Sequence, residues 1–281
     1  MKSLYTANRL AKTAGEEPQM RMGKMSGFGA LLKEWRGIRR MSQLDLALSA
    51  QVSARHVSFL ETGRARASRD MALRLGEELQ MPLAARNQLL LAAGFAPAFG
   101  GGELKDEDRA PLAQAVEWML ERHAPFPAIA IDHHWILKAM NPPAAALLTS
   151  VGVQLDDSLI DALCANEALR GALVNLEEVE ALTLMRLRNE LSHLGKAPVL
   201  QQAMQQLQRR VAAHSRPVLE QMPAVIPTHY RFNGLDLKLF STLTQFTSTG
   251  DLAMSELRLE MMFPVDHETK QALLALFRPT A

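Results

Sequence analysis

Residues 42–47 and 52–63 carry two short amphipathic patterns with a tight turn between them. At 100° per residue, Val57 and Leu60 fall on one side of the second pattern, which predicts a buried helix face. Ser42 and Ser53 can each cap a helix N-terminus through the hydroxyl, and Gly63 suits the left-handed residue that follows a helix end. The pattern therefore predicts two short helices joined as in a helix-turn-helix.

The other side of the second predicted helix combines a guanidinium, hydroxyls, a methyl group and a ring. These groups come from Ala54, Arg55, Ser58, Phe59 and Thr62. Such a surface suits the major groove of DNA, because arginine pairs with guanine O6 and N7 and alanine or phenylalanine contacts a thymine methyl. An ordinary helical hairpin is the alternative, and an exposed Phe59 together with the two serine caps counts against it.

The second half of the chain mixes strand and helix patterns. Apolar runs at 127–132 and 135–141 predict two short strands, and a helical block follows at about 156–214. Three further strands are expected at about 225–232, 235–247 and 252–263. Together these elements predict an antiparallel sheet of roughly five strands with helices on one face, which is an α+β fold.

Asn233 and Gly234 indicate a two-residue hairpin of type I′. In the register that this turn imposes, one face pairs Phe232 with Leu235, Tyr230 with Leu237, and Thr228 with Leu239. The other face pairs Arg231 with Asp236 and His229 with Lys238. The hairpin is therefore expected to have one apolar and one solvated face. The last strand shows the same division, because Leu257, Leu259 and Met261 alternate with Glu256, Arg258 and Glu260.

The net charge of +1 conceals two halves of opposite sign. Residues 1–95 contain 15 Lys and Arg against 8 Asp and Glu, a net charge of +7, whereas the remainder contains 16 against 22, a net charge of −6. The basic part is the one that carries the helix-turn-helix pattern, as binding to DNA phosphates requires. The acidic part is expected to bind no nucleic acid.

A chain of 281 residues is long enough for two domains. We expect a flexible arm at 1–27, a helix-turn-helix domain at 28–95, a linker at 96–110 and a second domain at 111–281. The three glycines at 100–102 fit a linker better than a phosphate-binding loop, because no Lys-Ser or Lys-Thr pair follows them.

Candidate chemistry for catalysis or metal binding is sparse. The single cysteine, Cys164, excludes an intramolecular disulfide and fits a reducing cytoplasm, so we expect a cytoplasmic protein. Asp132, His133 and His134 are adjacent and therefore point apart, and no second cluster completes a tetrahedral site. No nucleophile elbow, dinucleotide-binding fingerprint or membrane-spanning apolar run is found. We therefore expect no catalytic residues, no metal and no cofactor.

Residues 28–95 resemble the lambda-repressor-like, or xenobiotic-response-element (XRE), helix-turn-helix domain. The resemblance rests on Ser42-Gln43, Ala47, Val52-Ser53, Val57-Ser58 and Glu61-Thr62-Gly63. It implies an all-α unit of five helices at about 28–39, 43–50, 53–62, 69–79 and 82–93. It also implies that Gln43 binds a phosphate and that Ala54, Arg55 and Phe59 read bases. With the polar positions above, the expected DNA contacts are Gln43, Ser53, Ala54, Arg55, Ser58, Phe59 and Thr62. Gln51 stands where the family usually has glycine, at a cost of roughly 1 kcal/mol for a left-handed residue.

Residues 111–265 resemble the ligand-binding domain of the MmyB-like transcription regulators, which has a PAS-like fold. The similar segments are 127–132 with Trp135, 175–179, 240–246 and 255–264. The resemblance implies a sensor for a small ligand, with fatty-acyl chains as a plausible class. The expected ligand contacts are the apolar side chains of the sheet: Ile129, Ile131, Trp135, Tyr230, Phe232, Leu237, Leu239, Leu257, Leu259 and Met261. An ordinary core needs the same stripe of residues.

These observations predict a regulator of transcription that binds double-stranded operator DNA and responds to a small apolar ligand. A homodimer held mainly through the second domain is expected, because one helix-turn-helix reads only a few base pairs. Two alternatives remain open: an enzyme fused to an operator-binding module, and an antitoxin-type protein that masks a partner.

Overall fold

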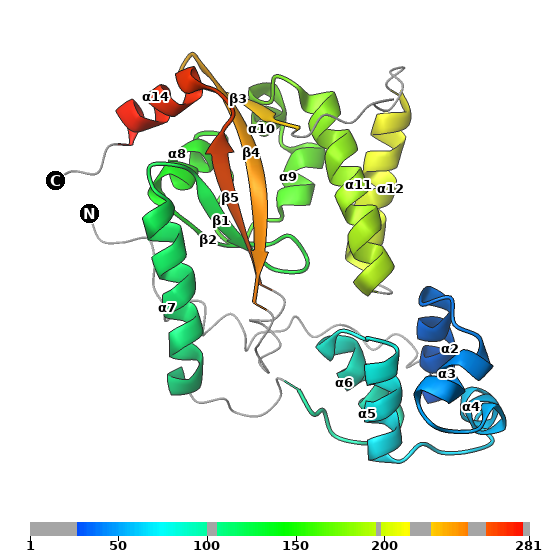
Figure 1. Ribbon diagram of the computed structural model, residues 1–281. Helices are drawn as coiled ribbons and strands as arrows, with labels where there is room; N and C mark the ends of the chain where they lie inside the picture. Colours follow the sequence, from blue (N-terminus) through cyan, green and yellow to red (C-terminus); the bar gives the residue numbers. More distant parts are fainter. Residues whose placement is uncertain (1–26, 100–105, 195–197, 214–225, 247–256, 278–281) are drawn as a thin grey trace.

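The computed structural model describes residues 27–99, 106–194, 198–213, 226–246 and 257–277 (Figure 1). The arm expected at 1–27 lies almost wholly outside these residues, as do parts of the strands expected at 225–232, 235–247 and 252–263.

The N-terminal unit consists of five helices, as predicted. They are α2 (Phe28–Ile38), α3 (Gln43–Ser49), α4 (Ala54–Glu61), α5 (Arg69–Glu78) and α6 (Leu83–Ala92). One apolar cluster joins them, centred on the fully buried Leu32, Leu46, Leu60 and Leu75. Ala47 is 1% exposed, so its small side chain lies at the contact between α3 and its neighbours, as expected for a closely packed helix pair.

Serine side chains begin three of these helices. The hydroxyls of Ser42, Ser53 and Ser68 accept hydrogen bonds from the backbone N–H groups of Asp45, His56 and Met71. Asp45 also accepts a bond from the backbone N–H of Ser42, which completes a capping box. The two serine caps predicted from the sequence are confirmed.

All five helices end in the same way, with a left-handed residue two positions after the last helical one. These residues are Arg40, Gln51, Gly63, Gln80 and Gly94. The N–H of the residue after each of them donates to the carbonyl five residues earlier in the chain. The N–H of Val52, for example, donates to the Ala47 carbonyl at 2.9 Å. This is the Schellman arrangement, which satisfies the last carbonyls of a helix. Gln51 therefore adopts the left-handed conformation expected at the turn, with φ of 54°.

The C-terminal unit contains a five-stranded sheet in the order β2-β1-β5-β4-β3, with every described neighbouring pair antiparallel. Its strands are β1 (Ala128–Ile131), β2 (Leu137–Met140), β3 (Thr228–Phe232), β4 (Leu235–Gln245) and β5 (Arg258–Pro264). Its helices are α7 (Asp106–His123), α8 (Pro142–Ser150), α9 (Leu159–Ala165), α10 (Glu167–Ala172), α11 (Leu176–Leu194), α12 (Pro198–Ala213) and α14 (His267–Leu276). The α+β class is confirmed. The described residues of the region expected to form one helical block, 156–214, form the four helices α9, α10, α11 and α12.

The hairpin between β3 and β4 has the predicted register. Tyr230 lies opposite Leu237, and Phe232 lies opposite Leu235. Asn233 and Gly234 have φ of 49° and 79°, the positive values that a type I′ turn requires.

Helices cover both faces of the sheet, which corrects the expectation that they cover one. Figure 1 shows α7 on one side of the sheet and α9, α11 and α12 on the other. Val116 and Leu120 of α7 form one cluster with Ala128, Ala130 and Leu259, whereas the larger cluster with α9–α12 contains Ile129 and Ile131. β1 is accordingly buried on both faces.

One buried amide joins α7 to the sheet and to α8. The Asn141 side chain is fully buried and accepts bonds from the N–H groups of Ala128 and Ala144 at 2.9 and 3.1 Å. Its amide group donates to the carbonyls of Leu120 and Phe126 at 3.1 and 2.8 Å. All four hydrogen-bonding positions of the side chain are therefore used.

The segment expected to be a linker at 96–110 is partly structured at each end. Asn87 of α6 accepts bonds from the N–H groups of Ala98 and Phe99, both at 3.0 Å, and its own amide donates to the Phe99 carbonyl. Helix α7 begins at Asp106, inside the expected linker.

Helices α2 and α4 approach each other so closely that only glycine fits at position 29. A Cβ on Gly29 would lie 2.3 Å from the carbonyl oxygen of Glu61 and 2.6 Å from that of Leu60. We expect Gly29→Ala to lower the free energy of unfolding of this unit by about 1–3 kcal/mol through overpacking. Gly37→Ala in the same helix is the control, because a Cβ there meets nothing within 4 Å. Calorimetry of the full chain should show no loss for the control, and equal melting of both variants would contradict the close contact.

Candidate functional site

The outward side of α4 presents the residues that the sequence analysis grouped together. Arg55, Ser53 and Thr62 are exposed, and Ala54, Ser58 and Phe59 are partly buried. Val57 and Leu60 point into the core, as predicted. The hydroxyl of Thr62 donates to the Ser58 carbonyl at 2.8 Å, so Thr62 retains only its acceptor capacity for another partner. Ser53 is the N-cap of the helix, which leaves α4 with its N-terminus exposed beside Arg55.

Phe59 is not the exposed ring that the sequence analysis expected. Its ring is half-buried and lies beneath two guanidinium groups, with the central carbons of Arg55 and Arg64 at 5.1 and 5.9 Å from the ring centroid. Arg64 was not among the predicted contacts. A signal for it was present in the sequence, because Gly63 ends α4 in a Schellman motif and the residue after it returns toward the last helical turn.

The side chain of Gln43 is bound within a hydrogen-bonded network with Glu61 and Arg36. Its amide donates to Glu61 at 2.7 Å, and Arg36 donates to both carboxylate oxygens of Glu61 at 2.7 and 3.1 Å. The Glu61 side chain is 3% exposed. Burial alone would raise the pKa of Glu61, but the bonds from Arg36 and Gln43 outweigh it and lower the pKa. The carboxylate therefore stays ionised and orients Gln43 at the start of α3.

The predicted ligand contacts separate into two groups on opposite faces of the sheet. Seven lie in the cluster between the sheet and α9–α12: Ile129, Ile131, Trp135, Tyr230, Phe232, Leu237 and Leu239. Leu257, Leu259 and Met261 lie in the cluster beneath α7 instead. Leu259 pairs with Ala130, so it shares the α7 face with the small residues of β1. The three residues of the second group therefore cannot border the same site as the other seven.

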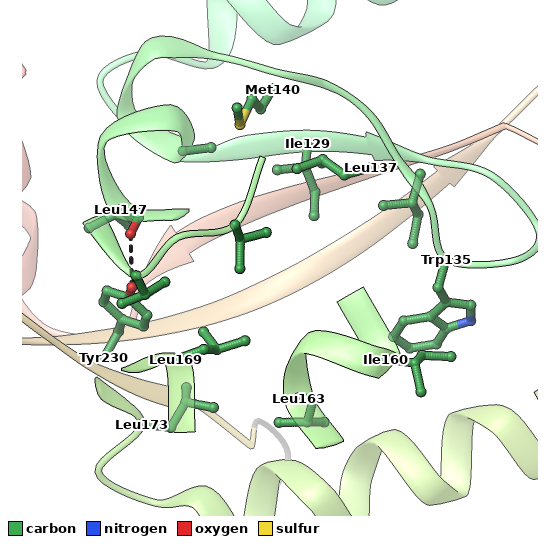
Figure 2. Packing of buried hydrophobic residues seen from close by; sticks show 14 of the residues in the cluster. Ile129, Trp135, Leu137, Met140, Leu147, Ile160, Leu163, Leu169, Leu173 and Tyr230 are labelled. Carbon is green, nitrogen blue, oxygen red and sulfur yellow. Dashed lines mark hydrogen bonds between the residues drawn. The ribbon is translucent and has the colours of Figure 1, made fainter. Parts of the chain in front are cut away.

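The larger cluster, which we call the sheet–helix core, includes many residues that the sequence analysis did not select. Many of them are leucines, six from helices and one, Leu173, from the position after α10: Leu163, Leu169, Leu173, Leu184, Leu187, Leu200 and Leu207. Figure 2 shows Leu163, Leu169 and Leu173 opposite the strand residues. Their helical spacing was visible in the sequence, but nothing there indicated which face of the sheet they cover.

Polar groups line the boundary of the sheet–helix core. The buried Tyr230 hydroxyl donates to the Leu147 carbonyl at 2.9 Å, and burial raises the pKa of this phenol (Figure 2). Trp135 adopts a left-handed conformation with φ of 64°, which is rare for a bulky residue. Asp132 holds this turn, because its carboxylate accepts bonds from the N–H groups of His134 and Ile136.

Charged side chains of α11 meet the sheet beside Trp135. The Arg186 guanidinium lies 4.4 Å from the centroid of the Trp135 ring and 3.4 Å from the buried carboxylate of Glu260. The Trp135 indole donates to Glu190 at 2.8 Å, and Glu190 also pairs with Arg258. Glu260 and Arg258 thus face α11, which corrects the expectation that this side of β5 is solvated.

The remaining candidate residues are the two adjacent histidines and the single cysteine. Among the residues that the structure describes, no group of three or more His, Cys, Asp and Glu is arranged to hold a metal ion. His133 and His134 form a turn, as expected, but the expectation that their side chains point apart is wrong, because their ring centroids are 3.7 Å apart. Cys164 is buried, and burial raises the pKa of its thiol. In the described part of the chain, no helix combines the length and apolarity needed to cross a bilayer.

The comparison with known families bears on the C-terminal unit. The five helices and their caps fit a helix-turn-helix unit. A search of curated protein sequences finds no match to the chain. The family model of the MmyB-like transcription regulator ligand binding domain matches residues 112–276, from α7 to the end of α14. Because this match covers more than half of the 281 residues, the chain belongs to the MmyB-like transcription regulators and carries their ligand-binding domain.

Proposed function

We propose that the protein is a cytoplasmic XRE-type regulator that binds operator DNA through α3 and α4 and senses an apolar ligand in its C-terminal domain. The observation that carries the proposal is the combination of two features in one chain. One is the family match over 112–276, and the other is a capped α4 that exposes Arg55 and its own N-terminus.

The charge of the N-terminal unit supports DNA as the partner. Residues 1–95 have a net charge of +7, and phosphate binding requires an excess of basic groups. Arg55 is exposed at the second position of α4, where recognition helices contact base edges. Gln43 is oriented by Glu61 at the start of α3, and the resemblance to the helix-turn-helix family assigns a phosphate to this position.

Substitution of Arg55 and Gln43 should separate base reading from phosphate binding. We expect Arg55→Ala to cost about 1–3 kcal/mol at one base position of a selected operator and little elsewhere. Gln43→Ala should instead weaken binding to all duplexes alike. Arg209→Ala on the exposed side of α12 is the control and should leave affinity unchanged. Binding to a panel of single-base operator variants measures both effects, and an equal loss on every duplex for Arg55→Ala would make it a phosphate contact.

The sheet–helix core is the proposed place for the ligand. It combines the seven predicted residues, six from strands and Trp135 from the turn before β2, with leucines from four helices, and a polar boundary adjoins it at Trp135 and Tyr230. Pockets for small molecules are mostly apolar with a few polar groups that fix orientation. A fatty-acyl chain would gain about 0.8 kcal/mol per buried CH₂.

Equivalent substitutions on the two faces of the sheet test this location. Leu237 and Leu259 are both fully buried strand residues, but only Leu237 faces the sheet–helix core. Each change to phenylalanine should cost about 1–3 kcal/mol through overpacking. Only Leu237→Phe should abolish the rise in melting temperature that a series of fatty acids causes in the full chain. If both variants keep the response, or the native chain shows none, the acyl ligand or its location is wrong.

We further propose that the protein binds DNA as a homodimer held mainly by the C-terminal domain. A two-fold operator then supplies two half-sites, and a ligand regulates binding only if it favours one form of the dimer over the other. Analytical sedimentation should give the mass of a dimer for the full chain, free and bound to DNA. A monomer in both conditions would remove this part of the proposal.

A further inference from the structure

Two arginines converge on the ring of Phe59 from different parts of the chain. Arg55 lies one helical turn before Phe59 on α4, so the two side chains share a helix face. Arg64 lies beyond the end of the helix and returns to the same ring. Its backbone N–H donates to the Phe59 carbonyl at 2.8 Å, and the N–H of Ala65 donates to the same carbonyl at 3.1 Å. The Schellman end of α4 thus fixes the backbone of Arg64 beside Phe59.

Both guanidinium groups remain available to a ligand. Arg55 and Arg64 are exposed, and within the described residues neither forms an ion pair or a side-chain hydrogen bond. Both guanidinium groups lie within 6 Å of the centroid of one ring, so their like charges repel each other, and their attraction to the ring offsets this only in part. A partner that offers acceptor atoms to one group and an anion to the other would offset the repulsion. Because the ring already restricts both side chains, binding them costs less conformational entropy than binding two free arginines.

We propose that Phe59 is a positioning residue that holds Arg55 for a guanine edge and Arg64 for a neighbouring phosphate, rather than a reader of thymine methyl groups. This inference rests on the proposed DNA binding. Arg55 is the second residue of α4, and the N-terminal part of a recognition helix contacts base edges. Arg64 follows the C-terminal end of the helix, where contacts to the DNA backbone set the register of the protein on the duplex.

The test uses the full chain and compares variants at positions 59 and 64. A duplex is first selected from a random library, and affinities are then measured for its single-base variants at several salt concentrations. Arg64→Ala should weaken binding to all duplexes alike and lower the slope of log Kd against log salt by about one. Melting temperatures confirm that each variant folds.

Phe59→Leu should keep an apolar side chain of similar size but remove the face of the ring. We expect it to reduce the preference for guanine at the Arg55 position by about 2- to 5-fold and to lower the salt slope as well. Phe59→Tyr is the matched control and should preserve both quantities, because its ring face is retained. If Phe59→Leu fails to fold, Phe59→Met makes the same comparison with a more flexible side chain.

Each result decides between distinct conclusions. If Phe59→Leu or Phe59→Met matches the native chain in guanine preference and salt slope, the ring only fills space and the inference is overturned. If Arg64→Ala loses affinity at one base position alone, the assignment of Arg64 to a phosphate is overturned. If the native chain selects no duplex, the proposed DNA binding fails and this inference fails with it.

Discussion

The side-chain amide of Asn141 connects the end of α7, the start of β1 and the start of α8 within the C-terminal domain. Each of its two donors and two acceptor positions is used by a backbone group, and the side chain is fully shielded from water. A buried polar network that is completely satisfied specifies one arrangement, because any shift leaves several groups without partners. Its bonds to the Leu120 carbonyl and to the Ala128 N–H tie the end of α7 to the start of β1, and α7 covers the face of the sheet that carries Ala128, Ala130 and Leu259.

The local elements could be predicted from the sequence because each depends on a few neighbouring residues. Ser42 and Ser53 begin helices, Gln51 and Gly63 end them, and Asn233 with Gly234 sets the hairpin register. These features require only hydroxyl caps, positive φ angles and a two-residue turn. Tertiary structure does not alter them.

The placement of the candidate ligand residues could not be predicted in the same way. Leu257 and Leu259 alternate with charged residues, a pattern that predicts one buried and one solvated face. Both faces are covered, because α7 packs on the leucines and α11 supplies Arg186 to the buried Glu260. An acidic residue in a strand indicates a solvent-exposed face only when no cation from a distant part of the chain pairs with it. Arg186 and Glu260 are 74 residues apart, so their pairing is not apparent from the sequence. The burial of Phe59 beneath two arginines is a similar case.

The helix ends of the N-terminal unit have a consequence for its evolution. Glycine occupies the left-handed position in only two of the five, and Arg40, Gln51 and Gln80 occupy the others. A side chain in this conformation costs roughly 1 kcal/mol relative to glycine. Glycine at any of these three sites, which lie outside the expected DNA contacts, should therefore raise the free energy of unfolding of the unit. Lineages of this regulator could gain this stability by single substitutions to glycine, and so tolerate destabilising changes in α4 that alter which operator is recognised.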